Sequence, residues 1–178
     1  MQTNEYLKDQ KQIIQDLLIA TLLELERYPE LTGGDLIVGA NENVLTLRNC
    51  GKGIPAGTIA RAVLPETDGA PLDRPVSELY PIEALMEADS FELHSFHSRE
   101  CTSLRYEKGA RQELRVYPDI AQDGLLIHLE WNGALPQDRI LSGKDVATAM
   151  RRLYSEDLSL ARPVWKPTVW FNGNRIRY

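Results

Sequence analysis

The sequence predicts an α+β fold, a two-layer sandwich with helices on one face of a mixed, mostly antiparallel β-sheet. Three features of the sequence support this prediction. Apolar residues recur at three- and four-residue steps near the start of the chain, which indicates an amphipathic helix. From Ser90 the apolar period changes to two, which is typical of strands with one buried face. Helical periodicity returns after Ser142, so helices and strands are grouped rather than strictly alternating, as in α+β proteins.

The first third of the chain is expected to hold a helix, a hairpin and a glycine-rich turn. The helix covers residues 4–28, with Asn4 as a candidate N-cap and Pro29 beyond its end. Two apolar runs separated by "ANEN" predict a β-hairpin with strands at Leu36–Gly39 and Val44–Arg48. The following turn, "CGKGIPAG", is dense in glycine, which lets a backbone bend sharply and approach a neighbour closely. After the turn we expect a short helix at 57–64, a loop at 65–75, and a helix at 76–88 that is broken or begins near Pro81. Four strands of an antiparallel meander are expected at 90–98, 102–109, 111–118 and 125–131. A helix at 142–156, with Ser142 as a possible cap, and a closing strand pair or one bent strand at 168–178 complete the chain.

Length and composition fit one soluble domain. The chain has 178 residues, of which 43% are hydrophobic and 26% charged, values near the average for globular proteins. We expect a single domain over residues 1–178. Its parts are an N-terminal helix (1–30), the hairpin and glycine turn (35–57), a shortened lid region and helix (58–89), the meander (90–131), and a closing helix and strand (142–178).

Charge and residue content exclude several classes of function. A formal net charge of −6 argues against a broad surface for duplex DNA, which requires clustered cations. No apolar run reaches the roughly 20 residues of a membrane span, and the polar start is unlike a secretory signal, so a cytoplasmic location is expected. Cys50 and Cys101 form no motif. His94 and His97 point to opposite faces of their strand, so we expect no metal site.

The element order and the stretch "GKGIPAG" resemble the gyrase-B-type ATPase domain of DNA gyrase and type IIA topoisomerases. Histidine kinases, MutL proteins and a heat-shock chaperone belong to the same superfamily. In gyrase-type proteins a hairpin leads into an Asp-x-Gly-x-Gly-Ile-Pro turn, and Asn49–Pro55 supplies Asn-Cys-Gly-Lys-Gly-Ile-Pro here. The resemblance therefore implies the histidine kinase/gyrase-B-like fold, with this turn on the adenine side of a nucleotide pocket.

The resemblance also implies a catalytic pair on the first helix. The family uses a Glu as general base and, four residues later, an Asn that holds Mg²⁺. These positions correspond to Asp16 and Ala20. Asp16 keeps a carboxylate, whereas alanine has no oxygen that could bind a metal ion. The alternative for Asp16 is an ordinary solvent-facing helix residue.

The implied adenine and phosphate sites are altered as well. The family's adenine-binding Asp corresponds to Asn49, and the implied remnant pocket adds Gly51, Gly53, Ile54 and Pro55. An amide oxygen can still accept a hydrogen bond, but Asn is also well suited to shaping a turn. The family's glycine-rich phosphate lid corresponds to residues 73–86, which contain no glycine and carry Glu78 and Glu83.

These differences leave three hypotheses. The first is a degenerate gyrase-B-like ATPase domain that does not hydrolyse ATP, needs no cofactor and serves as an interaction or regulatory module for a protein partner. The second is an ATP- and Mg²⁺-binding component of a topoisomerase-related system, completed by a partner or by homodimerisation. The third is a binder of a non-nucleotide small ligand in the remnant pocket. We favour the first, because the metal, adenine and phosphate positions are altered together.

Overall fold

The computed structural model describes residues 10–27, 34–63, 85, 88–108, 113–119, 123–154 and 167–178. Its helices are α1 (Gln10–Arg27), α2 (Ala56–Val63) and α4 (Gly143–Leu153), with a short 3-10 helix at Gln137–Arg139. Its strands are β1 (Asp35–Ala40), β2 (Val44–Asn49), β3 (Ser90–His97), β4 (Glu100–Glu107), β5 (Glu113–Pro118), β6 (Gly124–Glu130), β7 (Thr168–Phe171) and β8 (Asn174–Ile176).

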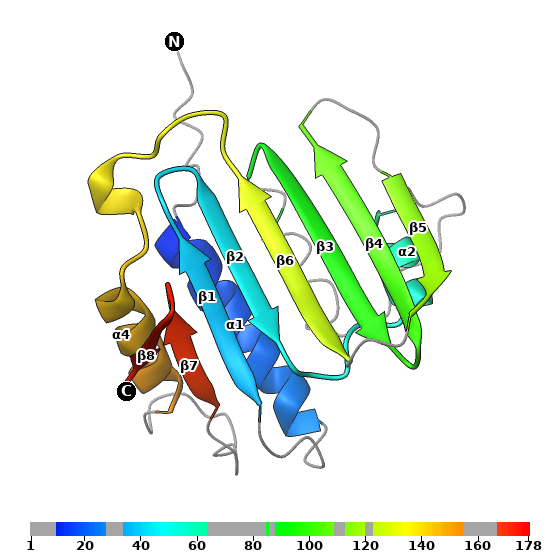
Figure 1. Cartoon of the computed structure of the whole chain (residues 1–178), viewed down its shortest axis with the longest axis horizontal. Coiled ribbons are helices and arrows are strands. Elements are labelled where there is room, and N and C mark those ends of the chain that lie inside the picture. Colours follow the sequence, from blue (N-terminus) through cyan, green and yellow to red (C-terminus); the bar gives the residue numbers. More distant parts are fainter. Residues whose placement is uncertain are drawn as a thin grey trace, which may run out of the picture.

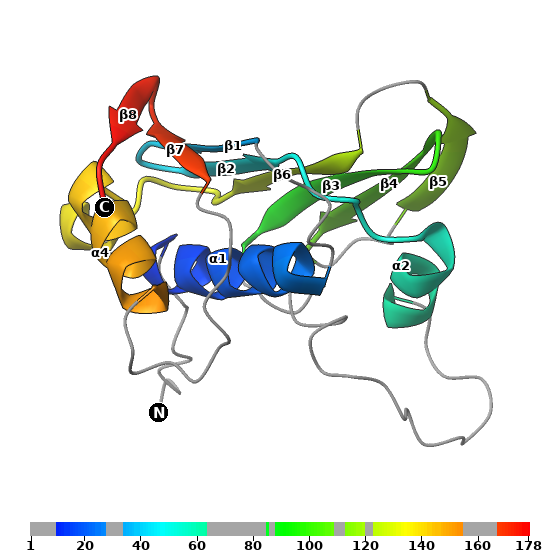
Figure 2. The ribbon, with the colours of Figure 1, turned by 90° about the horizontal axis from the view of Figure 1, so that it is seen from below.

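The described strands form one eight-stranded sheet in the order β5-β4-β3-β6-β2-β1-β7-β8 (Figure 1). Within it β1 and β7 run parallel, and every other neighbouring pair is antiparallel. Helices α1, α2 and α4 all lie on the same side of this sheet (Figure 2). The predicted α+β sandwich with a mixed, mostly antiparallel sheet is therefore confirmed.

The predicted meander is wrong in its last step. A meander would pair β6 with β5, whereas β6 lies between β3 and β2 and joins the two halves of the sheet. Burial explains the difference. Three alternate residues of β6 are buried, namely Leu125, Ile127 and Leu129. Their burial stabilises this strand most at a position in the sheet that the helix layer covers. By contrast, most of β5 is exposed, as suits an edge strand.

The core lies between the sheet and the helices. Strands β1 and β2 point alternate residues towards α1, and α1 returns an apolar stripe of buried residues at helical spacing. These residues are Leu36, Val38, Leu45 and Leu47 on the strands, and Ile13, Ile14, Leu17 and Leu18 on the helix. The predicted first helix is thus confirmed over residues 10–27, while its candidate cap at position 4 lies outside the described residues.

Gln10 fixes the start of α1 against the β1–β2 hairpin. Its side chain is fully buried, and its Nε2 donates to the carbonyl oxygens of Asn41 and Val44 at 2.9 and 3.3 Å. Its Oε1 accepts from the backbone N–H of Leu141 at 3.0 Å. A buried amide satisfied at both ends sets the helix in register with the strands. Consequently α1 runs from the hairpin towards the end of β2, where the glycine turn begins (Figure 1).

The closing helix and strand pair also match their sequence signals. Ser142 caps α4 in a capping box with Asp145, as its position before the apolar period predicted. Beyond α4, the Tyr154 ring stacks on Tyr178 with centroids 5.9 Å apart, which joins the helix to the C-terminal hairpin. The Tyr178 hydroxyl donates to the carbonyl oxygen of Pro167, and burial raises the pKa of Tyr178 to about 12.

None of the helices in the described ranges is long and apolar enough to cross a bilayer.

Candidate functional site

The glycine turn connects the end of β2 to the start of α2 on the helix-covered side of the sheet. Asn49 is the last residue of β2, and α2 begins at Ala56 directly after Pro55. The carbonyl oxygen of Pro55 accepts from the backbone N–H groups of Thr58 and Ile59, which starts the helix. Gly51 and Gly53 are buried, Ile54 is half-buried and Pro55 is exposed. The sequence-predicted pocket residues 49, 51 and 53–55 therefore lie together in one short turn.

Asn49 is held inside the protein by its side-chain carbonyl oxygen. Its Oδ1 accepts from the backbone N–H of Leu125 at 3.0 Å and from that of Gly51 at 3.2 Å. Since both partners are donors, the atom that faces them is the oxygen and the orientation of the amide is determined. The side chain is only 4% exposed, so both hydrogen bonds are buried. Asn49 thus fastens the turn to β6.

The turn is also fastened to β3, on the other side of β6. Ser95 is fully buried, and its Oγ accepts from the backbone N–H of Ile54 at 2.5 Å and donates to the Ile54 carbonyl oxygen at 2.9 Å. His97 Nδ1 lies 2.8 Å from the carbonyl oxygen of Lys52, and a carbonyl only accepts, so Nδ1 carries the proton. Side chains from two strands therefore hold the backbone of the turn in place.

Gly53 is required where the turn meets β3. Its φ is +72°, a conformation that L side chains rarely adopt, and a Cβ at this position would lie 2.3 Å from the carbonyl oxygen of Phe96. The sequence predicted close backbone approach at this glycine. In the structure the approaching group is the backbone of β3.

Removing the Ser95 hydroxyl is expected to weaken the whole turn. Ser95→Ala would leave the backbone N–H of Ile54 without its acceptor, and such a loss costs about 1–3 kcal/mol. The control is Ser103→Ala, because Ser103 is half-buried on the opposite face of the sheet, and we expect a change within about 0.5 kcal/mol there. Urea unfolding of both variants measures the difference. Equal destabilisation by the two substitutions would contradict the role given to Ser95.

Asp16, the candidate general base, is buried in α1. It is 4% exposed, and its Oδ1 accepts from Gln12 Nε2 at 3.3 Å, one helical turn earlier. The alternative that Asp16 is a solvent-facing helix residue is therefore wrong. Ala20 follows one turn later in the same helix, as the spacing predicted. Helix α1 lies in the layer that covers one face of the sheet (Figure 2).

The remaining sequence candidates add no further chemistry. The predicted lid at residues 73–86 lies outside the described residues except for Leu85, which is fully buried. His94 lies 3.8 Å from Glu92 on the uncovered face of β3, whereas His97 turns towards the glycine turn. Over the described ranges, no cluster of His, Cys, Asp and Glu could hold a metal ion. A hollow of about 370 Å³ lies away from the turn, at the β7–β8 hairpin beside Arg175 and Arg177.

Sequence reasoning missed Ser95, His97 and Gln10, which fix the site. For Ser95 a signal was present, since it follows Phe91 and Leu93 at the strand period and so occupies an inward position with a polar side chain. A buried polar residue in an apolar row needs a partner, and the partner here is the glycine turn.

Comparisons with known proteins support the fold. No protein-family model matches the chain, and no curated protein matches it. Among solved structures, the ATPase region of Saccharomyces cerevisiae topoisomerase II superposes with a TM-score of 0.61 at 14% identity over 94% of this chain. The same region bound to ICRF-187 (dexrazoxane) gives a TM-score of 0.60 at 15% identity over 93% of the chain.

The chain spans about half the length of those two structures, 49% and 48% respectively. At such low identity the likeness concerns the fold. The predicted resemblance to the ATPase domains of gyrase and type IIA topoisomerases is confirmed at that level.

Proposed function

We propose that this chain is a gyrase-B-like ATPase-type domain that no longer hydrolyses ATP and serves as an interaction or regulatory module. The observation that carries the proposal is the state of Asn49. Its only acceptor atom, Oδ1, already receives two backbone N–H groups from within the protein. Its other polar atom, Nδ2, can only donate. The amino group of adenine is itself a donor, so the position offers it a poor partner.

The other two implied contacts point the same way. Ala20 has no oxygen for Mg²⁺ at the position where the family has its metal-binding Asn. Asp16 is buried and its Oδ1 already accepts from Gln12, which leaves this carboxylate less free to take a proton from water. The residues present therefore do not fit ATP with Mg²⁺. The fold is intact, and hydrogen bonds from β2 and β3 hold its glycine turn. These features fit a domain whose role is to bind a partner and not to hydrolyse ATP.

Nucleotide titration tests the proposal directly. We expect isothermal titration with ATP and Mg²⁺ to give no micromolar binding, and phosphate release no faster than in buffer. Micromolar binding would contradict the proposal, and so would hydrolysis that Asp16→Ala abolishes. ATPase activity that appears only when a protein partner is added would support the alternative of a partner-completed ATPase. A thermal-shift screen that finds a stabilising non-nucleotide ligand would favour the small-ligand alternative.

A restored site provides the matching gain-of-function experiment. Asn49→Asp keeps an acceptor for both backbone N–H groups and turns the second polar atom into an acceptor, while Ala20→Asn returns an oxygen to α1. We expect the double variant to bind ATP at least about tenfold more tightly than the parent chain, which corresponds to about 1.4 kcal/mol. The control is the single variant Ala20→Asn, which retains Asn49. We expect it to bind ATP no more tightly than the parent chain, because it lacks the new carboxylate at position 49.

A further inference from the structure

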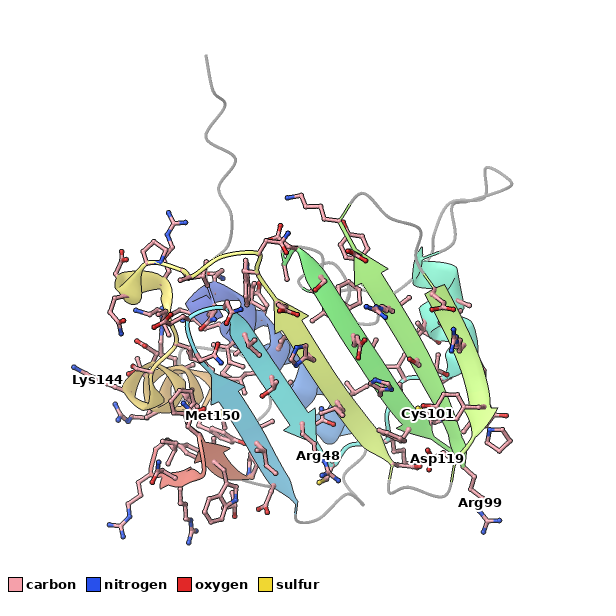
Figure 3. All side chains as sticks on the ribbon, turned by 45° about the horizontal axis from the view of Figure 1, so that its top comes forward. Arg48, Arg99, Cys101, Asp119, Lys144 and Met150 are labelled. Carbon is pink, nitrogen blue, oxygen red and sulfur yellow. The ribbon has the colours of Figure 1, made fainter. Side chains whose placement is uncertain are left out.

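Four side chains form a row across the face of the sheet that no described helix covers. The strand register places Trp170 of β7 beside Ile37 of β1, Ile37 beside Arg48 of β2, and Arg48 beside Leu126 of β6. Their sequence neighbours on β1, β2 and β6 point into the core, so these four point the other way. We call this row the cross-strand strip. Figure 3 shows its central residue, Arg48, on β2.

The strip exposes aliphatic surface in the middle of the sheet. Ile37 is 42% exposed and Leu126 is 38% exposed, and Arg48 lies exposed between them. A single exposed aliphatic side chain is ordinary, but two beside one cation in a continuous row form a defined surface. The strip does not lie at a sheet edge, so it does not serve strand addition.

Arg48 differs from Arg105 and Arg115 on this face in having no carboxylate of the described residues beside it. Arg175, which lies beside Trp170 at one end of the row, has none within 4.0 Å among the described residues either. Arg105 lies 3.7 Å from Glu92, and Arg115 lies 2.5 Å from Glu113. His94 shares Glu92 at 3.8 Å. For Arg48, the described residues provide no carboxylate within 4.0 Å. In a chain with a net charge of −6, this arginine is a cation set between aliphatic side chains, and the part of the chain that the structure describes gives it no counter-ion.

We propose that the cross-strand strip docks an acidic segment of a partner protein. A carboxylate of the segment meets the Arg48 guanidinium, which can hold it through two parallel hydrogen bonds. Apolar side chains of the same segment cover Ile37, Leu126 and Trp170, and their burial excludes water from the ion pair. Charge complementarity favours this occupant, because Arg48 lies between the two aliphatic residues of the row and Arg175 lies beside Trp170 at one end of it.

Nucleic acid fits this face less well. Two of the three apolar residues in the strip are aliphatic, whereas single-stranded nucleic acid is bound on aromatic faces. The proposal deepens the interaction role proposed above and rests on it. The cross-strand strip lies on the sheet face opposite the glycine turn. Peptide docking and nucleotide binding can therefore be measured separately.

The test uses a synthetic probe and the full chain. The probe is a fluorescein-labelled amphipathic peptide that carries glutamates beside leucines, and anisotropy measures its binding to the parent chain and to Arg48→Gln. We expect Arg48→Gln to weaken binding about tenfold, the size of a lost interfacial charge pair. We expect Arg115→Gln to change binding less than about twofold, because Arg115 lies on the same face but is already paired with Glu113.

A charge exchange makes the result specific. Arg48→Glu should bind the corresponding lysine–leucine peptide more tightly than the parent chain does, which a merely structural role of Arg48 would not produce. Equal peptide binding by the parent chain, Arg48→Gln and Arg115→Gln would overturn the proposal. So would binding of a single-stranded oligonucleotide that depends on Arg48, or self-association of the chain that Ile37→Ser abolishes. If the chain binds ATP and still docks the peptide through Arg48, the proposed loss of nucleotide binding is wrong and the docking proposal stands.

Discussion

Replacing Gly53 with alanine is expected to lower the free energy of unfolding by about 2–5 kcal/mol. About 1–2 kcal/mol arises because an L side chain is forced into the left-handed region at φ +72°. A further 1–3 kcal/mol, roughly, arises because the new methyl group would meet the carbonyl oxygen of Phe96 at 2.3 Å. That oxygen belongs to the backbone of β3, which cannot move without disturbing the ladder on both of its sides. The midpoint of guanidinium unfolding measures the loss.

Gly57→Ala is the matched control in the next element. Gly57 lies in the first turn of α2, and a Cβ there would have no neighbour within 4 Å. Alanine is the better helix former, so we expect a gain of about 0.5 kcal/mol. Gly39→Ala should fall between the two, because its clash at 2.5 Å is with the side-chain hydroxyl of Thr46, which can rotate away. An equal effect at all three glycines would show that the approach of the turn to β3 does not constrain position 53.

Local signals predicted the elements that depend on neighbouring residues. The hairpin and its glycine turn, α4 with its Ser142 cap, and the strand pair closed by "NGN" each carry their signal within a few residues. Asn172 and Gly173 have φ of +46° and +78° there, the conformations that the turn chemistry implies. Such features need no knowledge of the rest of the chain.

Tertiary placement could not be predicted in the same way. Strand β6 leaves the predicted meander because its partners lie far away in sequence, and alternation within one strand does not specify which edge it will join. The burial of Asp16 could not be predicted, because it depends on what packs around α1 in the folded protein. Gln10 likewise holds the start of α1 through partners more than 30 residues away in the sequence. The candidate site shows the same division, since the turn was predictable and the side chains that hold it were mostly not.

Replacing Asn49 with leucine is expected to cost about 2–6 kcal/mol of stability, while the number and branching of the side-chain heavy atoms stay the same. The substitution leaves the backbone N–H groups of Leu125 and Gly51 without their acceptor, and each orphaned buried donor costs about 1–3 kcal/mol. Asn49→Asp retains an acceptor for both N–H groups and should lose less stability than Asn49→Leu. Guanidinium unfolding provides the comparison, with Asn132→Leu as the control, because that exposed asparagine should change stability by no more than about 0.5 kcal/mol.

Amide hydrogen exchange separates this effect from general loosening of the fold. In Asn49→Leu the amide of Leu125 should exchange faster than the global loss of stability requires, because its hydrogen-bond acceptor is gone. The amide of Ile127, two residues further along β6, should follow only the global change. If both amides respond alike, Asn49 is an ordinary packing residue. A selective response at Leu125 means that position 49 fastens the turn to β6, and that its oxygen serves the fold instead of a ligand.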